Sequence, residues 1–88
     1  MKSPIKPDIN LLETLKQAII DGDSNKAIKL TNQSLNLRID SKAILEEAII
    51  KGAETAGSLY EKEIYFLADL LMTGEALNAA TEVVMNSL

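Results

Sequence analysis

The chain has 88 residues, which is enough for a single domain, residues 1–88, with one hydrophobic core. Of these residues 47% are apolar, 25% are charged and only 3% are aromatic, so the core of this globular domain must consist of Leu, Ile and Ala. Histidine, cysteine and tryptophan are absent, which excludes the usual proton shuttle, a thiol nucleophile and almost every zinc, iron or copper site. The net charge of −4, with nine scattered basic residues, disfavours a nucleic-acid partner. Neither an export signal nor a long apolar run occurs, so we expect a cytoplasmic protein without a membrane span.

Two helices are expected in the first half of the chain. The first covers residues 8–20: Asp8 caps it, apolar residues recur along it at spacings of three and four, and Gly22 ends it. A second helix opens at Asp23 or Ser24. Its apolar stripe is narrow and its other face is polar, which indicates an outer helix that packs on one side only.

The third expected helix begins at the cap pair Asp40-Ser41 and extends to about Tyr60. Apolar residues are dense along it, which indicates burial on more than one side and a central position in the fold. Gly52 and Gly57 each cost about 1 kcal/mol relative to Ala inside a helix. Two such residues in one helix predict that something approaches its backbone closely.

A turn near residues 62–66 separates this helix from a fourth, which runs from about Phe66 to Ser87 with apolar residues again at spacings of three and four. No stretch alternates for long enough to be a strand. Short connections between four helices favour antiparallel neighbours. We therefore predict an all-α fold, an antiparallel four-helix bundle.

Catalytic groups are scarce. Some carboxylates are paired in the sequence, but each pair lies in a polar stretch, where nothing would raise a pKa for acid–base work; the pairs are Glu46/Glu47, Glu61/Glu63 and Asp21/Asp23. A di-iron bundle requires histidines, a nucleophilic serine requires a base, and no glycine motif for phosphate binding occurs. We therefore expect no catalytic residue and no metal ligand, and no enzyme activity by this chain alone.

The three aromatic side chains, Tyr60, Tyr65 and Phe66, all lie where the last two predicted helices meet. Two interpretations are open. In the first, Phe66 and one tyrosine close the end of the hydrophobic core. In the second, the junction offers a lid surface to a large flat partner, a role that suits tyrosine because its ring is apolar and its tip is polar.

The sequence around this junction resembles the helical domain that precedes the cobalamin-binding domain in methionine synthase and in the corrinoid proteins of methanol and methylamine methyltransferase systems. The resemblance covers roughly residues 8–86, and its specific part reads Gly57-x-Leu59-Tyr60-Glu61-x-x-x-Tyr65-Phe66-Leu67-x-x-Leu70-Leu71-Met72-x-x-Glu75-Ala76-Leu77. In that family the bundle lies over the upper face of the corrin ring and shields the cobalt-bound methyl group from water. The resemblance implies a cap module of a corrinoid methyl carrier that works with a methyltransferase partner, with cobalamin as cofactor through an upper-face contact only.

The resemblance also implies the residues that touch the cofactor. In methionine synthase the bulky contacts are an aromatic residue at the end of the third helix and a leucine seven residues later, which match Tyr60 and Leu67. Leu71, one turn beyond Leu67, and Gly57, one turn before Tyr60, are expected to face the same way. Phe66 is expected to anchor the junction inside the bundle.

Three features depart from the family pattern. Glu63 stands where the family often has Gly, and Ala68 stands where it often has Pro. The Asp-x-His-x-x-Gly motif, whose histidine binds the lower face of the cobalt, belongs to a following α/β domain and does not occur here. The chain is therefore expected to cover a cobalamin bound by a separate α/β domain, either as a split protein or as the cap piece of a longer one.

Two other functions stay open. One is a non-catalytic dimerisation or sensor module of a cobalamin-linked regulator, although light-sensing regulators of this kind use a Trp and a His that are absent here. The other is a structural bundle without a ligand. Without a corrin partner, the apolar face with Tyr60, Leu67 and Leu71 would be exposed, so we expect a homodimer through it. The partner methyltransferase selects the methyl donor, so these residues leave open methanol, a methylamine, a methoxylated aromatic compound or a folate.

Overall fold

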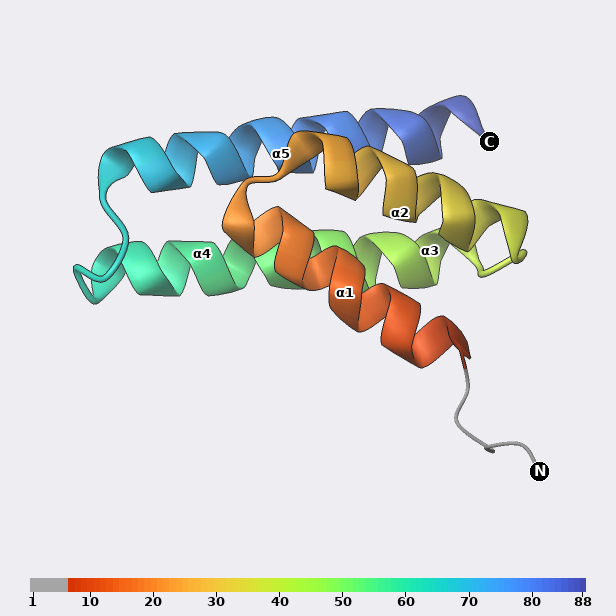
Figure 1. Cartoon of the computed structure of the whole chain (residues 1–88), viewed down its shortest axis with the longest axis horizontal. Helices are drawn as coiled ribbons and strands as arrows, with labels where there is room; N and C mark the ends of the chain where they lie inside the picture. Colours follow the sequence, from red (N-terminus) through yellow and green to blue (C-terminus); the bar gives the residue numbers. More distant parts are fainter. Residues whose placement is uncertain (1–6) are drawn as a thin grey trace.

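The computed structural model describes residues 7–88, with side chains from residue 10 onward. Its helices are α1 (Pro7–Asp21), α2 (Ser24–Asn36), α3 (Ser41–Ala43), the π-helical segment η1 (Ile44–Ile50), α4 (Lys51–Glu61) and α5 (Leu67–Asn86). Because α3, η1 and α4 follow one another without a break, the described residues form four rods and no strand, which confirms the predicted all-α helical bundle (Figure 1). The cap predicted at Asp8 lies outside the described side chains.

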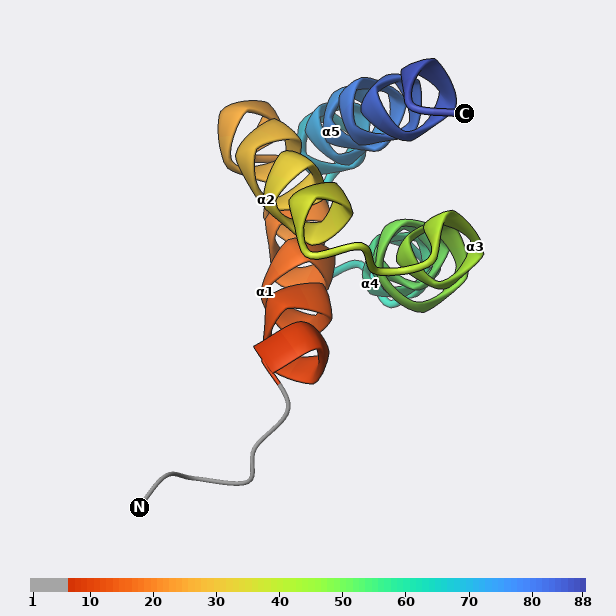
Figure 2. The same cartoon turned by 90° about the vertical axis from the view of Figure 1, so that its right-hand side faces the viewer.

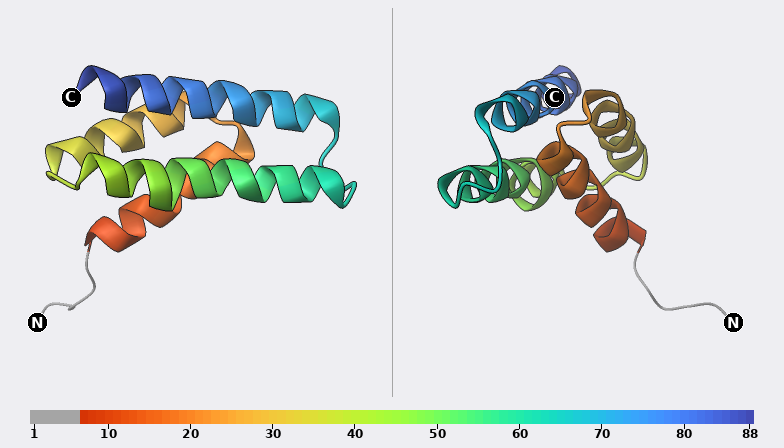
Figure 3. Two further views of the ribbon diagram at one scale, coloured as in Figure 1. Left: turned by 180° about the vertical axis from the view of Figure 1, so that it is seen from behind. Right: turned by 60° about the vertical axis from the view of Figure 1, so that its left-hand side comes forward.

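Consecutive rods run in opposite directions and are joined by short turns (Figure 1). α2 and α5 lie side by side, the rod from α3 to α4 runs alongside α5, and α1 crosses the others obliquely (Figures 1 and 3). Seen end-on, α1 and α2 form one side of the bundle, and α5 and the α3–α4 rod form the other (Figure 2). The α4–α5 loop lies at one end of the bundle, and the α2–α3 loop and the end of α5 lie at the opposite end (Figure 1).

The core centres on α1, which contacts α2, η1, α4 and α5. Leu15, Ala18 and Ile19 follow one another at helical spacing and are almost completely buried. The α3–α4 rod packs on α1 and α5 but leaves Ile50 and Tyr60 exposed, so the prediction that the third helix is central was wrong. Its apolar residues are dense because they occupy two faces, of which this chain covers one.

α2 begins as predicted, since the carboxylate of Asp23 accepts a hydrogen bond of 3.1 Å from the N–H of Lys26. The hydroxyls of Thr31 and Ser34 are buried and donate to backbone carbonyls one turn earlier in the same helix. The face of α2 away from α1 and α5 is polar and exposed, which agrees with the prediction of an outer helix.

Three helices end in the same way, with one residue in the left-handed backbone region. The φ angle is +71° at Gly22, +64° at Arg38 and +63° at Glu63. At each end, two backbone N–H groups donate to carbonyls three and five residues earlier, so the last carbonyls of the helix stay hydrogen-bonded. Glycine adopts this conformation without strain, yet two of the three positions hold a residue with a Cβ atom.

The predicted close approach to the third rod is confirmed at Gly52. A Cβ atom added there would lie 2.8 Å from the Cβ of Ile19 and 2.9 Å from the carbonyl oxygen of Lys16, because α1 packs directly on its backbone. At Gly57, by contrast, no atom lies within 4 Å of an added Cβ. The bundle itself therefore gives no packing reason for a glycine at position 57.

α5 has two apolar faces. One is buried against the other helices and consists of Thr73, Ala76, Ala80 and Val84. The other includes Leu67 and Leu71 and is exposed, so only part of the apolar pattern that predicted this helix contributes to the core. Within residues 7–88, no helix is long and apolar enough to cross a membrane.

Candidate functional site

Two exposed apolar helix faces meet at the α4–α5 loop. We define the junction face as the four residues that the sequence singled out there, Gly57, Tyr60, Leu67 and Leu71. Tyr60 near the end of α4 is 43% exposed, and Leu67 and Leu71 at the start of α5 are 58% and 61% exposed. Gly57 is partly exposed. These residues therefore present an apolar surface at one end of the bundle and contribute little to its core.

The structure brings Tyr60 and Leu67 together. Both border one open hollow of about 580 Å³, whose other lining residues are Glu61, Glu63, Tyr65 and Phe66. Leu71 and Gly57 do not line this hollow. Leu71 lies one helical turn after Leu67 in α5, and Gly57 lies about one turn before Tyr60 in α4. At these spacings, each shares a side of its helix with that neighbour.

The structure corrects the role expected for Phe66. This side chain is 72% exposed, so the prediction that it anchors the junction inside the bundle was wrong. Phe66 precedes α5 in an extended conformation, outside the helix and its buried face, and its N–H donates to the carboxylate of Asp69 at 2.9 Å. The anchor is the neighbouring Tyr65, whose hydroxyl donates to the backbone carbonyl of Ile20 at 2.7 Å. No pattern in the sequence distinguishes these two adjacent aromatic residues.

Burial raises the pKa of the Tyr65 phenol above its ordinary value of 10.0, and the negative charges of Asp21 and Asp69 act in the same direction. The phenol therefore stays protonated at neutral pH and remains a hydrogen-bond donor. Glu61 and Glu63 lie at the rim of the hollow and are exposed, as are the other carboxylate pairs noted in the sequence. Solvent surrounds these carboxylates, as predicted from their polar neighbours.

The junction face combines aliphatic side chains with one phenol and includes no carboxylate and no amine. Among residues 7–88, no group of three or more acidic side chains is placed to hold a metal ion. A surface of this kind can cover a broad, flat ring and exclude water from it.

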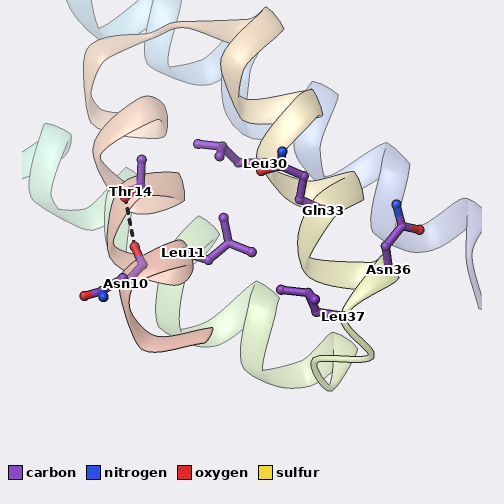
Figure 4. Close-up of a pocket in the computed structure, with 7 residues that line it drawn as sticks. All are labelled: Asn10, Leu11, Thr14, Leu30, Gln33, Asn36 and Leu37. Atoms are coloured by element: carbon purple, nitrogen blue, oxygen red, sulfur yellow. Dashed lines mark hydrogen bonds between the residues drawn. The ribbon is translucent and has the colours of Figure 1, made fainter. Parts of the chain in front are cut away.

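A second hollow was not predicted from the sequence. It has a volume of about 640 Å³, lies between α1 and α2, and is lined by Asn10, Leu11, Thr14, Leu30, Gln33, Asn36 and Leu37 (Figure 4). Leucine side chains point into it from both helices, and amides stand at its edge (Figure 4). Leu37, one of the residues that line this α1–α2 groove, lies in the α2–α3 loop. That loop is at the end of the bundle away from the α4–α5 loop (Figure 1). The groove holds no charged side chain.

Residues 11–85, which include the whole junction face, match a family model described as B12 binding domain. Among curated proteins, the chain is similar to a corrinoid protein of Desulfitobacterium hafniense, with 31% identity over 75 residues that cover 85% of this chain and 35% of that protein. It is also similar to trimethylamine corrinoid protein 1 of Methanosarcina mazei, with 28% identity over 84% of this chain and 34% of that protein. The chain thus spans about a third of the length of these relatives.

Among solved structures, the fold is similar to that of the Methanosarcina barkeri monomethylamine corrinoid protein. The TM-score is 0.87 at 21% sequence identity, over 91% of this chain and 38% of that one. At this identity the likeness concerns the fold. Part of that protein therefore has the same helical arrangement as this chain, including the oblique α1.

Proposed function

Since the chain belongs to the B12 binding domain family, we propose that it is the helical cap module of a corrinoid methyl-carrier protein, with cobalamin as the cofactor that it covers. A separate α/β domain holds the cobalamin, and the junction face lies over the upper side of the corrin ring. The catalytic partner is a methyltransferase, and both proteins act in the cytoplasm. The role of this chain in methyl transfer is to cover the cofactor.

The observation that carries this proposal is the exposure of three large side chains, Tyr60, Leu67 and Leu71, on two helices that meet at one end of the bundle. Exposed apolar residues gathered in this way are typical of a surface that meets a partner. The hollow between Tyr60 and Leu67 is open to solvent and not enclosed, so a ring held by another domain can lie against it.

Three residues of the junction face, Gly57, Tyr60 and Leu67, have distinct roles in this arrangement. Bound cobalamin would supply a cobalt centre able to carry a methyl group. Tyr60 and Leu67 would exclude water and dissolved oxidants from the space above it, because apolar side chains packed on a ring leave no room for solvent. The open space at Gly57 would let the edge of the ring approach α4 closely. A methyltransferase must reach the same centre, so the cap must also be able to move aside.

A protection assay tests the proposal. The chain is mixed with the cobalamin-binding domain of a corrinoid protein that carries methylcobalamin, and demethylation or oxidation is followed by visible absorption. We expect the wild-type chain to slow this loss. The double variant Tyr60→Ala/Leu67→Ala should slow it several-fold less, because it removes most of the apolar surface over the ring.

Leu37→Ala is the matched control. Leu37 is 58% exposed, the same fraction as Leu67, but it lies in the α1–α2 groove. Because both leucines are exposed, each single substitution should change the free energy of unfolding by less than about 0.5 kcal/mol. Protection should persist in Leu37→Ala. Equal protection by the wild-type chain and the double variant would refute the cap role.

Without the α/β domain, the junction face has no partner from this chain. We propose that a second copy then covers it, so that the isolated chain forms a homodimer through Tyr60, Leu67 and Leu71. Sedimentation equilibrium should show a dimer that Leu67→Glu converts to a monomer, while Leu37→Glu leaves it intact. A strictly monomeric wild-type chain at high concentration would contradict this.

A further inference from the structure

The backbone carbonyl of Ile20 accepts two side-chain hydrogen bonds from residues far away in the sequence. The hydroxyl of Tyr65 donates to it at 2.7 Å, and the hydroxyl of Thr73 donates to it at 3.0 Å. Ile20 lies in the last turn of α1, where carbonyls lack a partner within the helix. This single acceptor therefore joins the end of α1 both to the α4–α5 loop and to α5.

Tyr65 is held through its backbone as well. Its N–H donates to the carbonyl of Leu59 at 3.0 Å, and the N–H of Ile64 donates to the same carbonyl at 2.9 Å. The main chain thus ties Tyr65 to the end of α4, while its side chain ties it to the end of α1. The next residues are Phe66, which precedes α5, and Leu67, which begins it. Tyr65 therefore lies two residues before the start of α5 and is bonded to the ends of both α4 and α1.

We infer that Tyr65 is a positioning residue, whose hydroxyl holds the α4–α5 loop against α1 and thereby sets the placement of Leu67 relative to Tyr60 across the hollow. The anchoring of the loop by Tyr65 does not depend on the proposed function. Its consequence for cobalamin rests on that function. Tyr65→Phe keeps the ring and removes only the hydrogen bond to Ile20. This variant isolates the contribution of the hydroxyl.

Thr73 provides the comparison. It donates to the same carbonyl, but from within α5, where the helix already fixes the main chain. Thr73→Val removes one hydrogen bond to Ile20 and keeps the shape of the side chain. It should lower the stability of the whole bundle without releasing the loop. Thr73→Val thus separates a general loss of stability from a loss of position.

Amide hydrogen exchange in the full chain tests the anchor directly. The reporters are the amides of Ile64, Tyr65 and Phe66, each of which donates a hydrogen bond within the junction. In Tyr65→Phe they should exchange about fivefold faster than in the wild type, as expected for the loss of one neutral hydrogen bond that closes the loop. The amides in the middle of α2 should change less. Circular dichroism checks that the variant remains helical.

In Thr73→Val, the junction amides should change no more than the amides of α2. An equal acceleration in both variants would assign Tyr65 a purely structural role and overturn the inference. Unchanged exchange at Ile64, Tyr65 and Phe66 in Tyr65→Phe would overturn it as well.

The protection assay with methylcobalamin separates this inference from the proposed function. If Tyr65→Phe loses protection while Thr73→Val retains it, the positioning role in the cap is supported. If Tyr60→Ala/Leu67→Ala loses protection while Tyr65→Phe does not, the cap role stands and the positioning role fails. If neither Tyr60→Ala/Leu67→Ala nor Tyr65→Phe loses protection, although the junction amides of Tyr65→Phe exchange faster, the anchor stands and the proposed function fails.

Discussion

Glu63 occupies at the end of α4 the same left-handed position that Gly22 occupies at the end of α1, with φ angles of +63° and +71°. In both places the residue's N–H donates to the carbonyl three residues earlier, and the next N–H donates to the carbonyl five residues earlier. Glycine adopts this geometry without strain, so position 63 would suit a glycine better than the glutamate that stands there. The turn forms without the glycine, but the Cβ of Glu63 makes it costly.

We therefore predict that Glu63→Gly stabilises the chain. Relief of the left-handed conformation is worth about 1–2 kcal/mol, and the added freedom of glycine in the unfolded chain offsets about 0.5–1 kcal/mol of this gain. The free energy of unfolding in urea should rise by about 1 kcal/mol. Glu54→Gly, at an exposed position inside α4, is the control and should lower it by about the same amount. A decrease in both variants would contradict the geometry at Glu63.

The two glycines of the third rod should respond in opposite ways to alanine. Gly52→Ala places a Cβ against Ile19 and Lys16 of α1, and the resulting overlap should destabilise the chain by roughly 1–2 kcal/mol after the gain in helix propensity. Gly57→Ala meets no atom within 4 Å and should stabilise the chain by up to about 1 kcal/mol. Thermal or urea unfolding measures both effects.

Because the proposed cap places Gly57 over the edge of the ring, the stabilising variant Gly57→Ala should also protect methylcobalamin less well than the wild type. A gain in stability together with a loss of protection would separate function from folding at this residue. Equal destabilisation by Gly52→Ala and Gly57→Ala would show that α1 is not the reason for the glycine at position 52.

Much of this fold could be predicted from the sequence, because helix boundaries depend on local chemistry. Asp23 caps α2 as expected, and Gly22 ends α1. The left-handed residues Arg38 and Glu63 were not predicted, since no side chain at these positions signals that conformation.

The candidate site could be predicted in part. The exposure of Tyr60 and Leu67 agrees with the expectation from the family resemblance, because the apolar density of the last two rods exceeds what one core can bury. The roles of Tyr65 and Phe66 could not be assigned in advance. They depend on the path of a five-residue loop, 62–66, and on the carbonyl of Ile20, which accepts the Tyr65 hydroxyl from 45 residues earlier in the chain. A local sequence pattern does not predict a hydrogen bond between residues this far apart in the chain.

Stability at high pH should depend on Tyr65. Its pKa in the unfolded chain is near 10.0 and is raised in the folded chain, so the folded state binds the phenolic proton more tightly. The stabilisation is therefore fully present below pH 10 and is lost as the pH rises through the higher pKa of the folded state. We expect the wild-type chain to lose stability above pH 10 more steeply than Tyr65→Phe.

Tyr60→Phe is the control for this pH dependence, because it removes the exposed phenol and keeps the one bound to Ile20. It should follow the wild-type curve of unfolding free energy against pH. Parallel curves for the wild type and Tyr65→Phe would mean that the hydrogen bond to Ile20 does not protect the phenolic proton.

The most direct test of the central claim is to map the surface that meets the cofactor. The ¹⁵N-labelled chain is titrated with the cobalamin-binding domain of a corrinoid protein carrying methylcobalamin, and the amide chemical shifts are compared with those obtained with the same domain lacking cobalamin. We predict cobalamin-dependent shifts centred on Gly57, Tyr60, Leu67 and Leu71, and none in the α1–α2 groove. Shifts centred on that groove, or equal shifts with and without cobalamin, would contradict the account.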